Sequence, residues 1–463
     1  MSLSRNHRAS TGSFSSAVAA EQTTREKPRE NNKLRAEDRS IHDWYRFVLS
    51  FPPHLVREYV DRFHIRPGDC VLDPFCGTGT TLVECKKSGI VGIGIEPNPM
   101  AHFASQTKLD WEVNPDGLWD HAQEIARMTL KKLNIQGISD ENDLPLFHST
   151  DRSPPKLKTL PSEAFKILLK NSISPLPLHK TLVLLETMEN KKSEKFDKHE
   201  RLALAKGIVQ EIGNLHFGPE VGVGQLKSNA PVVEIWLKNI RAIAEDLREL
   251  KDKKRVKTVA HLADARNLTG ILKPNSIDAV ITSPPYPNEK DYTRTTRLES
   301  VLLGFIKSKV DLRALKSNLI RSNTRGVYKI DTDDRLVEDH AEIRRIAEEI
   351  EKRRIELGKT SGFERQYARV TKLYFGGMAR HFAELRHLLR PGARLAYVVG
   401  DQASYLRVMI RTGQLLADIA QSMGYELMGI DLFRTRLATA TKEQLREEVV
   451  LLRWPGNKKG AAR

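Results

Sequence analysis

The chain has few cysteines and no long apolar run, and both features exclude several classes of protein. Its 463 residues include three cysteines, Cys70, Cys76 and Cys85, which cluster without the paired spacing of a zinc site. A count this low is typical of a reducing compartment. No stretch approaches the roughly 18 apolar residues of a membrane span, and the N-terminal region lacks an apolar signal core. We therefore expect a cytoplasmic protein without a membrane partner.

Acidic residues are also in the minority, with 59 Asp and Glu against 75 Lys and Arg. The net charge is +16 and the pI is near 9.6. A basic protein suits a polyanionic partner, although charge alone does not identify one. Residues 1–38 are rich in Ser, Arg, Asn and Glu, and we predict a disordered tail there. Residues 456–463 form a short basic tail at the other end.

Strand and helix patterns alternate along much of the chain. The first strand, 70–72, the helix 80–87 and the strand 90–95 read as a βαβ unit. This alternation predicts an α/β fold, a doubly wound Rossmann-like sheet whose ligands bind beyond the carboxyl ends of the strands. The other predicted core elements are strands at 256–262, 277–281, 394–399 (after a turn at Pro391-Gly392), 426–433 and 448–452, and helices at 378–389 and 411–423.

Two largely helical insertions interrupt the alternation. Residues 111–254 contain helical patterns near 118–133 and 234–250. Residues 301–370 begin with a basic stretch, 301–330, which a charged helix follows. The insertions divide the predicted core into three parts, 39–110, 255–300 and 371–455.

A glycine loop follows the first strand, in the string Asp73-Pro74-Phe75-Cys76-Gly77-Thr78-Gly79. Gly77 and Gly79 allow a tight strand-to-helix turn in which the backbone comes close to a ligand. The loop lacks the Lys of a nucleotide P-loop, and Leu82 stands where a dinucleotide fold has its third Gly. S-adenosylmethionine fits best, because its ammonium and its ribose both favour carboxylates.

Three carboxylates at predicted strand ends have separate expected roles. Asp73 can accept a hydrogen bond from a cationic amine, and it would repel a pyrophosphate. Glu96, one βαβ unit later, occupies the usual position of a carboxylate that bonds both ribose hydroxyls. Asp264, at the end of the next strand, can accept the adenine amino group. These positions predict a cofactor site along one edge of the sheet.

A second string, Thr282-Ser283-Pro284-Pro285-Tyr286, follows another apolar strand. The two prolines stiffen the turn. The Ser283 hydroxyl and the Pro284 carbonyl can both accept hydrogen bonds from one exocyclic base amine, and a base can stack on Tyr286. Such a base must be flipped out of a duplex to be reached. In the following loop Asp291 and Tyr292 are candidates for shaping the pocket, and Asp401, at the end of a later strand, is a candidate for the same cleft.

Together these strings resemble the amino-group DNA methyltransferases of bacterial restriction-modification systems. In that family an Asp-Pro-Phe-x-Gly-x-Gly-Thr-Thr string binds S-adenosylmethionine, and an [Asn/Asp/Ser]-Pro-Pro-[Tyr/Phe] string holds the target amine. The resemblance covers about 41–110, 255–300 and 370–455, and Phe51-Pro52-Pro53 is similar to the family's leading cofactor-binding region. It implies cofactor-binding roles for Asp73, Phe75, Gly77, Gly79, Glu96 and Asp264, and catalytic roles for Ser283, Pro284, Pro285 and Tyr286.

The resemblance also implies double-stranded DNA as the substrate, the cytoplasm of a bacterium or archaeon, and a separate restriction endonuclease that acts on the same site. Thr-Ser-Pro-Pro-Tyr is similar to the N4-cytosine enzymes, whereas Asp-Pro-Pro-Tyr is commoner among N6-adenine enzymes. We therefore expect the N4 amine of cytosine to be the methyl acceptor, with N6 of adenine as the alternative.

Other functions use a similar loop. A cytosine C5 methyltransferase is excluded because no cysteine follows a proline. An RNA or protein amine methyltransferase and a non-catalytic nucleic-acid-binding protein remain open. For target recognition we expect the basic stretch 301–330 first and residues 111–254 second, because basic side chains near the catalytic loop can reach phosphates.

Overall fold

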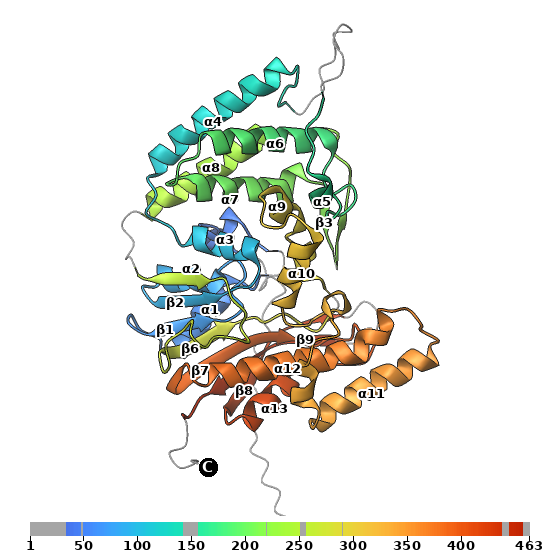
Figure 1. Ribbon diagram of the computed structural model, residues 1–463. Helices are drawn as coiled ribbons and strands as arrows, with labels where there is room; N and C mark the ends of the chain where they lie inside the picture. Colours follow the sequence, from blue (N-terminus) through green and yellow to red (C-terminus); the bar gives the residue numbers. More distant parts are fainter. Residues whose placement is uncertain are drawn as a thin grey trace, which may run out of the picture.

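A seven-stranded sheet forms the centre of the molecule (Figure 1). The computed structural model describes residues 34–47, 50–141, 156–218, 220–250, 256–288, 290–437 and 444–456. The strand order is β5-β2-β1-β6-β7-β9-β8. The first five strands are parallel, and β9 runs antiparallel between β7 and β8. The strands are β1 (Cys70–Asp73), β2 (Val91–Ile95), β5 (Thr258–His261), β6 (Ile277–Thr282), β7 (Leu389–Gly400), β8 (Glu426–Leu437) and β9 (Gln444–Arg453).

Helices cover both faces of the sheet, which confirms the predicted doubly wound α/β fold. Leu72 and Leu395 pack in one apolar cluster with α11 (Ala341–Glu356), α12 (Tyr367–Leu385) and α13 (Thr412–Ser422). Their neighbours Val71 and Ala396 face the opposite side and pack with α1 (Pro53–Arg62). Because successive strand residues point to opposite faces, a strand covered on both sides is apolar throughout. α2 (Thr80–Lys87) and α3 (Pro99–Lys108) complete the βαβ side.

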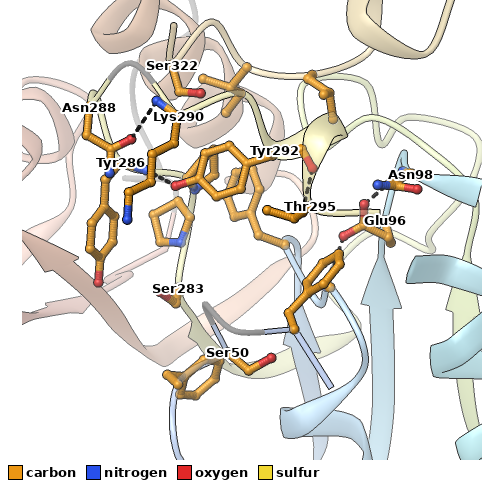
Figure 2. A pocket seen from close by; sticks show the side chains of 18 of the residues that line it. Ser50, Glu96, Asn98, Ser283, Tyr286, Asn288, Lys290, Tyr292, Thr295 and Ser322 are labelled. Atoms are coloured by element: carbon orange, nitrogen blue, oxygen red, sulfur yellow. Dashed lines mark hydrogen bonds between the residues drawn. The ribbon is translucent and has the colours of Figure 1, made fainter. Parts of the chain in front are cut away.

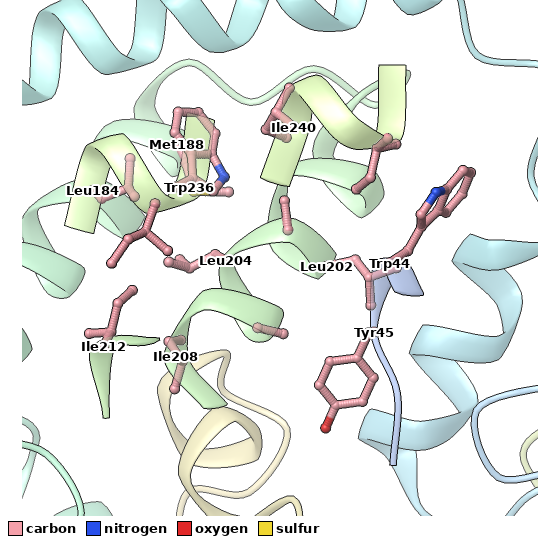
Figure 3. Packing of buried hydrophobic residues seen from close by; sticks show 14 of the residues in the cluster. Trp44, Tyr45, Leu184, Met188, Leu202, Leu204, Ile208, Ile212, Trp236 and Ile240 are labelled. Carbon is pink, nitrogen blue, oxygen red and sulfur yellow. The ribbon is translucent and has the colours of Figure 1, made fainter. Parts of the chain in front are cut away.

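The first insertion builds a helical layer on top of the sheet domain (Figure 1). One continuous apolar cluster joins it to the N-terminal segment, because Trp236 is packed with Leu204 and Ile240 in the same cluster as Trp44 and Tyr45 (Figure 3). Its elements are α4 (Pro115–Ile135), α5 (Ser162–Phe165), α6 (Pro175–Asn190), α7 (Asp197–Gly207), the π-helical turn η4 (Ile208–Ile212), the hairpin β3 (Leu215–Phe217) and β4 (Val221–Val223), and α8 (Val232–Glu249).

The second insertion runs from the end of α9 (Arg297–Leu302), beside the helices of the first insertion, past α10 (Lys309–Ser317) to α11 below the sheet (Figure 1). Within the described ranges, no helix is long and apolar enough to cross a membrane. The 3-10 turn η5 (Tyr292–Arg294) and the start of α9 precede the insertion. Its further elements are α10, α11, and the short 3-10 turns η6 (Thr324–Gly326), η7 (Asp333–Val337) and η8 (Glu364–Gln366).

The predicted N-terminal tail extends too far. Residues 1–33, and 457–463 of the basic tail, lie outside the described residues. Ala36–Asp38, however, form the 3-10 turn η2, followed by η3 (His42–Trp44). Asp38 is buried, and its carboxylate pairs with Arg57 at 2.8 Å. A polar composition predicts disorder only when the polar groups lack a partner in the fold. Asp38 has such a partner, because Arg57 lies on α1.

Two core elements are longer than predicted. α12 begins at Tyr367, eleven residues before the predicted start at 378, because its first turns cover α11 and η7. β7 begins at Leu389 and runs through the predicted turn at Pro391-Gly392. There the register against β6 shifts, and the Gly392 N–H donates to the carbonyl of Trp454 instead of turning the chain. A proline is tolerated at such an irregularity near a strand end.

Gly376 of α12 provides a test of this packing. A Cβ at Gly376 would lie 1.8 Å from the backbone oxygen of Asp333, whereas a Cβ at Gly377 would lie 3.4 Å from Ile320. We expect Gly376→Ala to lower the free energy of unfolding by about 2–4 kcal/mol through overpacking. The matched variant Gly377→Ala should change it by no more than about 1 kcal/mol. Urea denaturation measures both, and equal midpoints would contradict this packing of η7 on α12.

Candidate active site

The site lies where the chain reverses its direction across the sheet. From β1 the chain passes to β2 and β5 on one side, while β6 and β7 lie on the other side of β1. The carboxyl ends of β1 and β6 therefore flank a crevice, which is where open α/β sheets bind ligands. A hydrogen bond joins the two ends, because the Thr282 hydroxyl donates to Asp73 Oδ1 at 2.6 Å.

A cavity of about 340 Å³ opens at this point. It brings together most of the residues that the sequence predicts for the site. Phe75, Gly77, Glu96, Asp264, Ser283, Pro284, Pro285 and Tyr286 all line it. Asp73 and Gly79 do not line it, and each lies directly behind its wall. The cofactor and catalytic strings thus share one cavity.

Asp73 is fully buried. Its Oδ1 accepts the Thr282 hydroxyl and, at 3.1 Å, the N–H of Phe75. Burial raises the pKa of Asp73 to about 6, and the hydrogen bond from Thr282 opposes that rise. Through these two hydrogen bonds the Asp73 carboxylate connects the glycine loop to the strand end that precedes Ser283.

The two loop glycines have different structural roles. Gly77 has φ +52°, and its N–H donates to Glu96 Oε2 at 2.9 Å. Gly79 has φ +85° and is the N-cap of α2. A Cβ at Gly79 would lie 2.5 Å from the hydroxyl oxygen of Ser105. Both positions need a left-handed backbone, and Gly79 also permits close packing of α3 on the loop.

Glu96 presents its carboxylate to the cavity from the end of β2 (Figure 2). Oε1 accepts the N–H of Asn98 at 2.8 Å, and Oε2 accepts the N–H of Gly77 at 2.9 Å. Burial raises the pKa of Glu96 to about 7, against these two hydrogen bonds. Each carboxylate oxygen keeps a second lone pair for a ligand hydroxyl.

Asp264 lines the cavity while its carboxylate is held from behind. Arg266 Nη2 donates to Asp264 Oδ2 at 2.7 Å, and Arg266 Nη1 donates to Asp333 at 2.7 Å. The guanidinium therefore fixes Asp264 against η7. Arg266 also donates to Asp264 Oδ1 from its backbone N–H at 2.9 Å, and its Nε is shared between Oδ1 at 3.0 Å and Oδ2 at 3.1 Å. Because three donors of Arg266 share the two oxygens, at most one lone pair of the carboxylate is left for a ligand amine.

The Phe75 ring is fixed by a buried histidine. It lies 5.0 Å from the ring centroid of His381 in an edge-on contact. His381 Nδ1 donates to the carbonyl of Ala265 at 3.0 Å, and its Nε2 accepts from the Tyr397 hydroxyl at 2.7 Å. Burial lowers the pKa of His381 to about 4, so this histidine is neutral. Because His381 is neutral, it supports the Phe75 ring without placing a charge beside it, and the ring presents an apolar surface to the cavity.

The Ser283-Pro284-Pro285-Tyr286 turn is held by two hydrogen bonds. The Ser283 hydroxyl donates to the carbonyl of Val398 at 3.2 Å, so its oxygen has acceptor capacity, and the Ser283 side chain also interacts with the Tyr286 hydroxyl. The Tyr286 N–H donates to the Tyr292 hydroxyl at 3.0 Å. Figure 2 shows Tyr292 between Tyr286 on one side and Glu96 on the other. Tyr292 therefore shapes the pocket, as expected.

The two other acids considered for the site are engaged elsewhere. Asp291 lines the cavity, but its carboxylate bonds Thr293 and, at 2.8 Å, Lys316. Burial would raise the pKa of Asp291, and Lys316 holds it below the usual range. The expectation that Asp401 faces the cleft is wrong. It does not line the cavity, and its carboxylate pairs with Arg411 and accepts the Arg446 N–H, because β9 covers that end of β7.

The basic stretch 301–330 is partly internal. Arg321 is buried, and its guanidinium bonds both oxygens of Asp331. Lys316 is paired with Asp291, and Arg325 with Glu220 at 3.5 Å. Arg321 and Lys316 are therefore internal ion-pair partners that support the second insertion, whereas Arg325 is exposed.

Sequence reasoning missed several residues of the cavity wall. Phe47 and Ser50 come from the N-terminal segment, and Arg434, Arg436 and Glu447 come from β8 and β9. Glu447 begins a string, 447–452, that is similar to the last strand of the family, but no local signal places any of these residues at the cavity. The place of Arg434, Arg436 and Glu447 follows from the pairing of β8 with β9 beside β7.

The three cysteines, of which Cys76 lines the cavity, are held as thiols. All three are free and buried. Burial raises the pKa of Cys70 to about 11 and that of Cys76 well above its usual value, so neither is a thiolate at neutral pH. Among the described residues, no group of three His, Cys, Asp or Glu side chains has the arrangement of a metal site.

Comparisons with known proteins agree with this geometry. Residues 17–106 match a family model described as DNA methylase. The Type II methyltransferase M.BsoBI of Geobacillus stearothermophilus is 28% identical over 459 residues, which cover 90% of this chain and 85% of that protein. The Type II methyltransferase M.AvaI of Nostoc sp. is 22% identical over 446 residues, which cover 89% of this chain and 86% of that protein. M.MjaII of Methanocaldococcus jannaschii is 39% identical over 69 residues, which cover 15% of this chain and 13% of that protein.

Proposed function

Because the chain belongs to the amino-group DNA methyltransferase family, we propose that it transfers a methyl group from S-adenosylmethionine to the N4 amine of a cytosine in double-stranded DNA. The observation that carries this proposal is the shared cavity, which the Ser283-Pro284-Pro285-Tyr286 turn and the Glu96 carboxylate both line. Thr-Ser-Pro-Pro-Tyr favours cytosine over adenine as the target. N6 of adenine is the second candidate, since its exocyclic amine needs the same two acceptors.

The cofactor end of the cavity suits S-adenosylmethionine. The whole cavity has a volume of about 340 Å³, which lies in the range of small-molecule sites. Glu96 would accept both ribose hydroxyls, Asp264 the adenine amine, and Phe75 would offer a ring face to the adenine. Gly77 and Gly79 would let the loop backbone approach the cofactor. Asp73, buried behind the loop, would position it through Phe75 and Thr282.

At the target end the residues would activate the amine. The lone pair of an exocyclic amine is delocalised into the base, so the amine is a weak nucleophile. The Ser283 oxygen and the Pro284 carbonyl would accept its two N–H groups, draw the nitrogen toward tetrahedral geometry and localise the lone pair. Bound S-adenosylmethionine would supply an electrophilic methyl group. Pro285 would keep the turn rigid and Tyr286 would stack on the flipped base.

The relatives' names suggest the biological setting. M.BsoBI and M.AvaI are Type II methyltransferases. We propose that this chain likewise protects a DNA site that a separate restriction endonuclease cleaves.

One experiment tests the reaction. The purified protein is incubated with double-stranded DNA and labelled S-adenosylmethionine, and the modified nucleoside is then identified after digestion. Detection of N4-methylcytosine would support the proposal. Detection of N6-methyladenine would change the proposed target base to adenine and leave the proposed mechanism unchanged. Label on RNA alone would overturn the DNA substrate. Cofactor binding without transfer to either would favour a non-catalytic role.

The raised pKa of Glu96 predicts a pH-dependent cofactor affinity. With a pKa of about 7, Glu96 is protonated at pH 6 and ionised at pH 8, and the ionised form is the better acceptor for two ribose hydroxyls. We expect S-adenosylhomocysteine, the reaction product, to bind about 5- to 10-fold more weakly at pH 6 than at pH 8. Calorimetric titration measures this. Glu96→Gln should flatten the profile between these values, and an equally steep profile in that variant would assign the titration to another group.

A further inference from the structure

Three cationic side chains converge on the target end of the cavity. Lys290 follows the catalytic turn, and Arg434 and Arg436 come from β8; all three line the cavity. Arg434 Nε lies 2.6 Å and Arg436 Nε 3.5 Å from the carboxylate of Glu447, which faces them from β9. Since Arg434 and Arg436 are two residues apart on a strand, they lie on the same face.

The local geometry of β8 sets the direction of the Arg434 and Arg436 side chains. β8 is the edge strand of the sheet, so its outer side is open to a partner. Its register against β9 shifts between Leu432 and Arg434, where Phe433 is buried against the sheet. A bulge of this kind redirects the side chains that follow it.

The cluster is short of negative charge. Arg434 and Arg436 share the single carboxylate of Glu447, and Lys290 adds a third cation, so the group carries 3 − 1 = +2. Within the part of the chain that the structure describes, the Lys290 ammonium has no ion-pair or hydrogen-bond partner. Burial lowers the pKa of Lys290, and the nearby Arg436 lowers it further. The neighbouring acid Glu220 is already shared by Arg294, at 3.0 Å, and Arg325.

The cluster lies at the target end of the cavity. A Cβ at Gly400 would lie 3.1 Å from the Tyr286 ring and 3.2 Å from Glu447, so Tyr286 and Glu447 are neighbours. Figure 2 shows Lys290 on the Tyr286 side of Tyr292, while Glu96 and Asn98 lie on the other side. An anion held here would therefore be next to the flipped base and away from the ribose-binding carboxylate.

We propose that Lys290, Arg434 and Arg436 form a clamp for the backbone phosphate of the nucleotide whose base enters the cavity. This inference rests on the proposed function and adds the group that holds the flipped strand. A phosphodiester would neutralise part of the unmatched charge and give the Lys290 ammonium a partner. Such contacts fix the position of the nucleotide without reading its sequence.

The test compares three variants in DNA binding. The clamp variant carries Lys290→Gln, Arg434→Gln and Arg436→Gln. The control variant carries Arg390→Gln, Arg394→Gln and Arg453→Gln. These changes remove three arginines at the opposite end of the strands, where β7 begins and β9 ends. A charge-retaining variant carries Arg434→Lys and Arg436→Lys. Thermal unfolding confirms that each variant is folded before affinities are compared.

Affinity for a 30-base-pair duplex is then measured over a range of salt concentrations by fluorescence anisotropy. For the clamp variant we expect binding about tenfold weaker at low salt and a log–log salt slope smaller by about 1, the value for one lost phosphate contact. The KM for DNA should rise in parallel. The control variant should retain the wild-type slope, and the charge-retaining variant should recover most of it.

Several outcomes would overturn the clamp. One is a clamp variant with the wild-type salt slope, and another is a control variant that loses as much affinity. A clamp variant that binds DNA normally but loses affinity for S-adenosylhomocysteine would assign the cations to the cofactor's carboxylate. A wild-type protein that binds no duplex would overturn the proposed function together with the clamp, so the two failures are distinguishable.

Discussion

Replacing Ser283 with alanine is expected to lower the kcat of methyl transfer by about 100- to 1,000-fold, the effect of removing one preorganised hydrogen-bond group at a reacting atom. The Ser283 hydroxyl is held by its donation to the Val398 carbonyl, so its lone pairs are directed rather than mobile. Without it, the amine would keep one acceptor, the Pro284 carbonyl, and the lone pair would stay delocalised. Cofactor affinity should not change, since Glu96 and the glycine loop are untouched.

Ser276→Ala is the matched control for this variant. Ser276 directly precedes β6, at the opposite end of the strand from Ser283, and its hydroxyl donates to the Lys273 carbonyl. We expect its kcat within about twofold of wild type, as for a surface substitution away from the site. Single-turnover rates at saturating DNA and cofactor separate chemistry from binding. A Ser283→Ala protein that transfers methyl groups at the wild-type rate would remove the hydroxyl from the mechanism.

Glu96→Ala is expected to weaken cofactor binding by about 100-fold or more. Each hydrogen bond to a charged group contributes about 1.5–3 kcal/mol, and two ribose hydroxyls would lose their acceptor. The variant also leaves the N–H groups of Gly77 and Asn98 without the carboxylate that orders the loop. Glu96→Gln should weaken binding as well, because one of these N–H groups would then face the amide NH₂ instead of an acceptor oxygen.

Calorimetric titration with S-adenosylhomocysteine measures the loss, with Asp69→Ala as the control. Asp69 is an acid at the other end of the adjoining strand, where its carboxylate accepts the Arg66 N–H. Its removal should leave the cofactor affinity unchanged. Thermal unfolding of each variant without ligand shows whether the fold is retained. Wild-type affinity in a folded Glu96→Ala protein would place the ribose elsewhere.

Local patterns in the sequence predicted the parts of the site that follow buried strands. The glycine loop, Glu96 and Ser283 each begin at or directly after the end of a buried strand, and the carboxyl ends of parallel strands meet at one edge of a sheet. A short string and a general rule of the fold were therefore enough to bring these residues together. The same rule failed for Asp401, because an antiparallel strand, β9, covers the end of β7 and supplies Arg446 as its partner.

By itself the sequence determined the α/β alternation, the glycine loop, the Ser283-Pro284-Pro285-Tyr286 turn and the excess of basic residues. Only the tertiary structure decided that Asp73 is buried behind the loop, that Arg321 and Lys316 are internal, and that Arg434 and Arg436 reach the cavity. Strand periodicity and turn chemistry act over a few residues, so they can be read along the chain. Ion pairs and cavity walls join residues far apart, and strand register and the packing of the insertions set which of them meet.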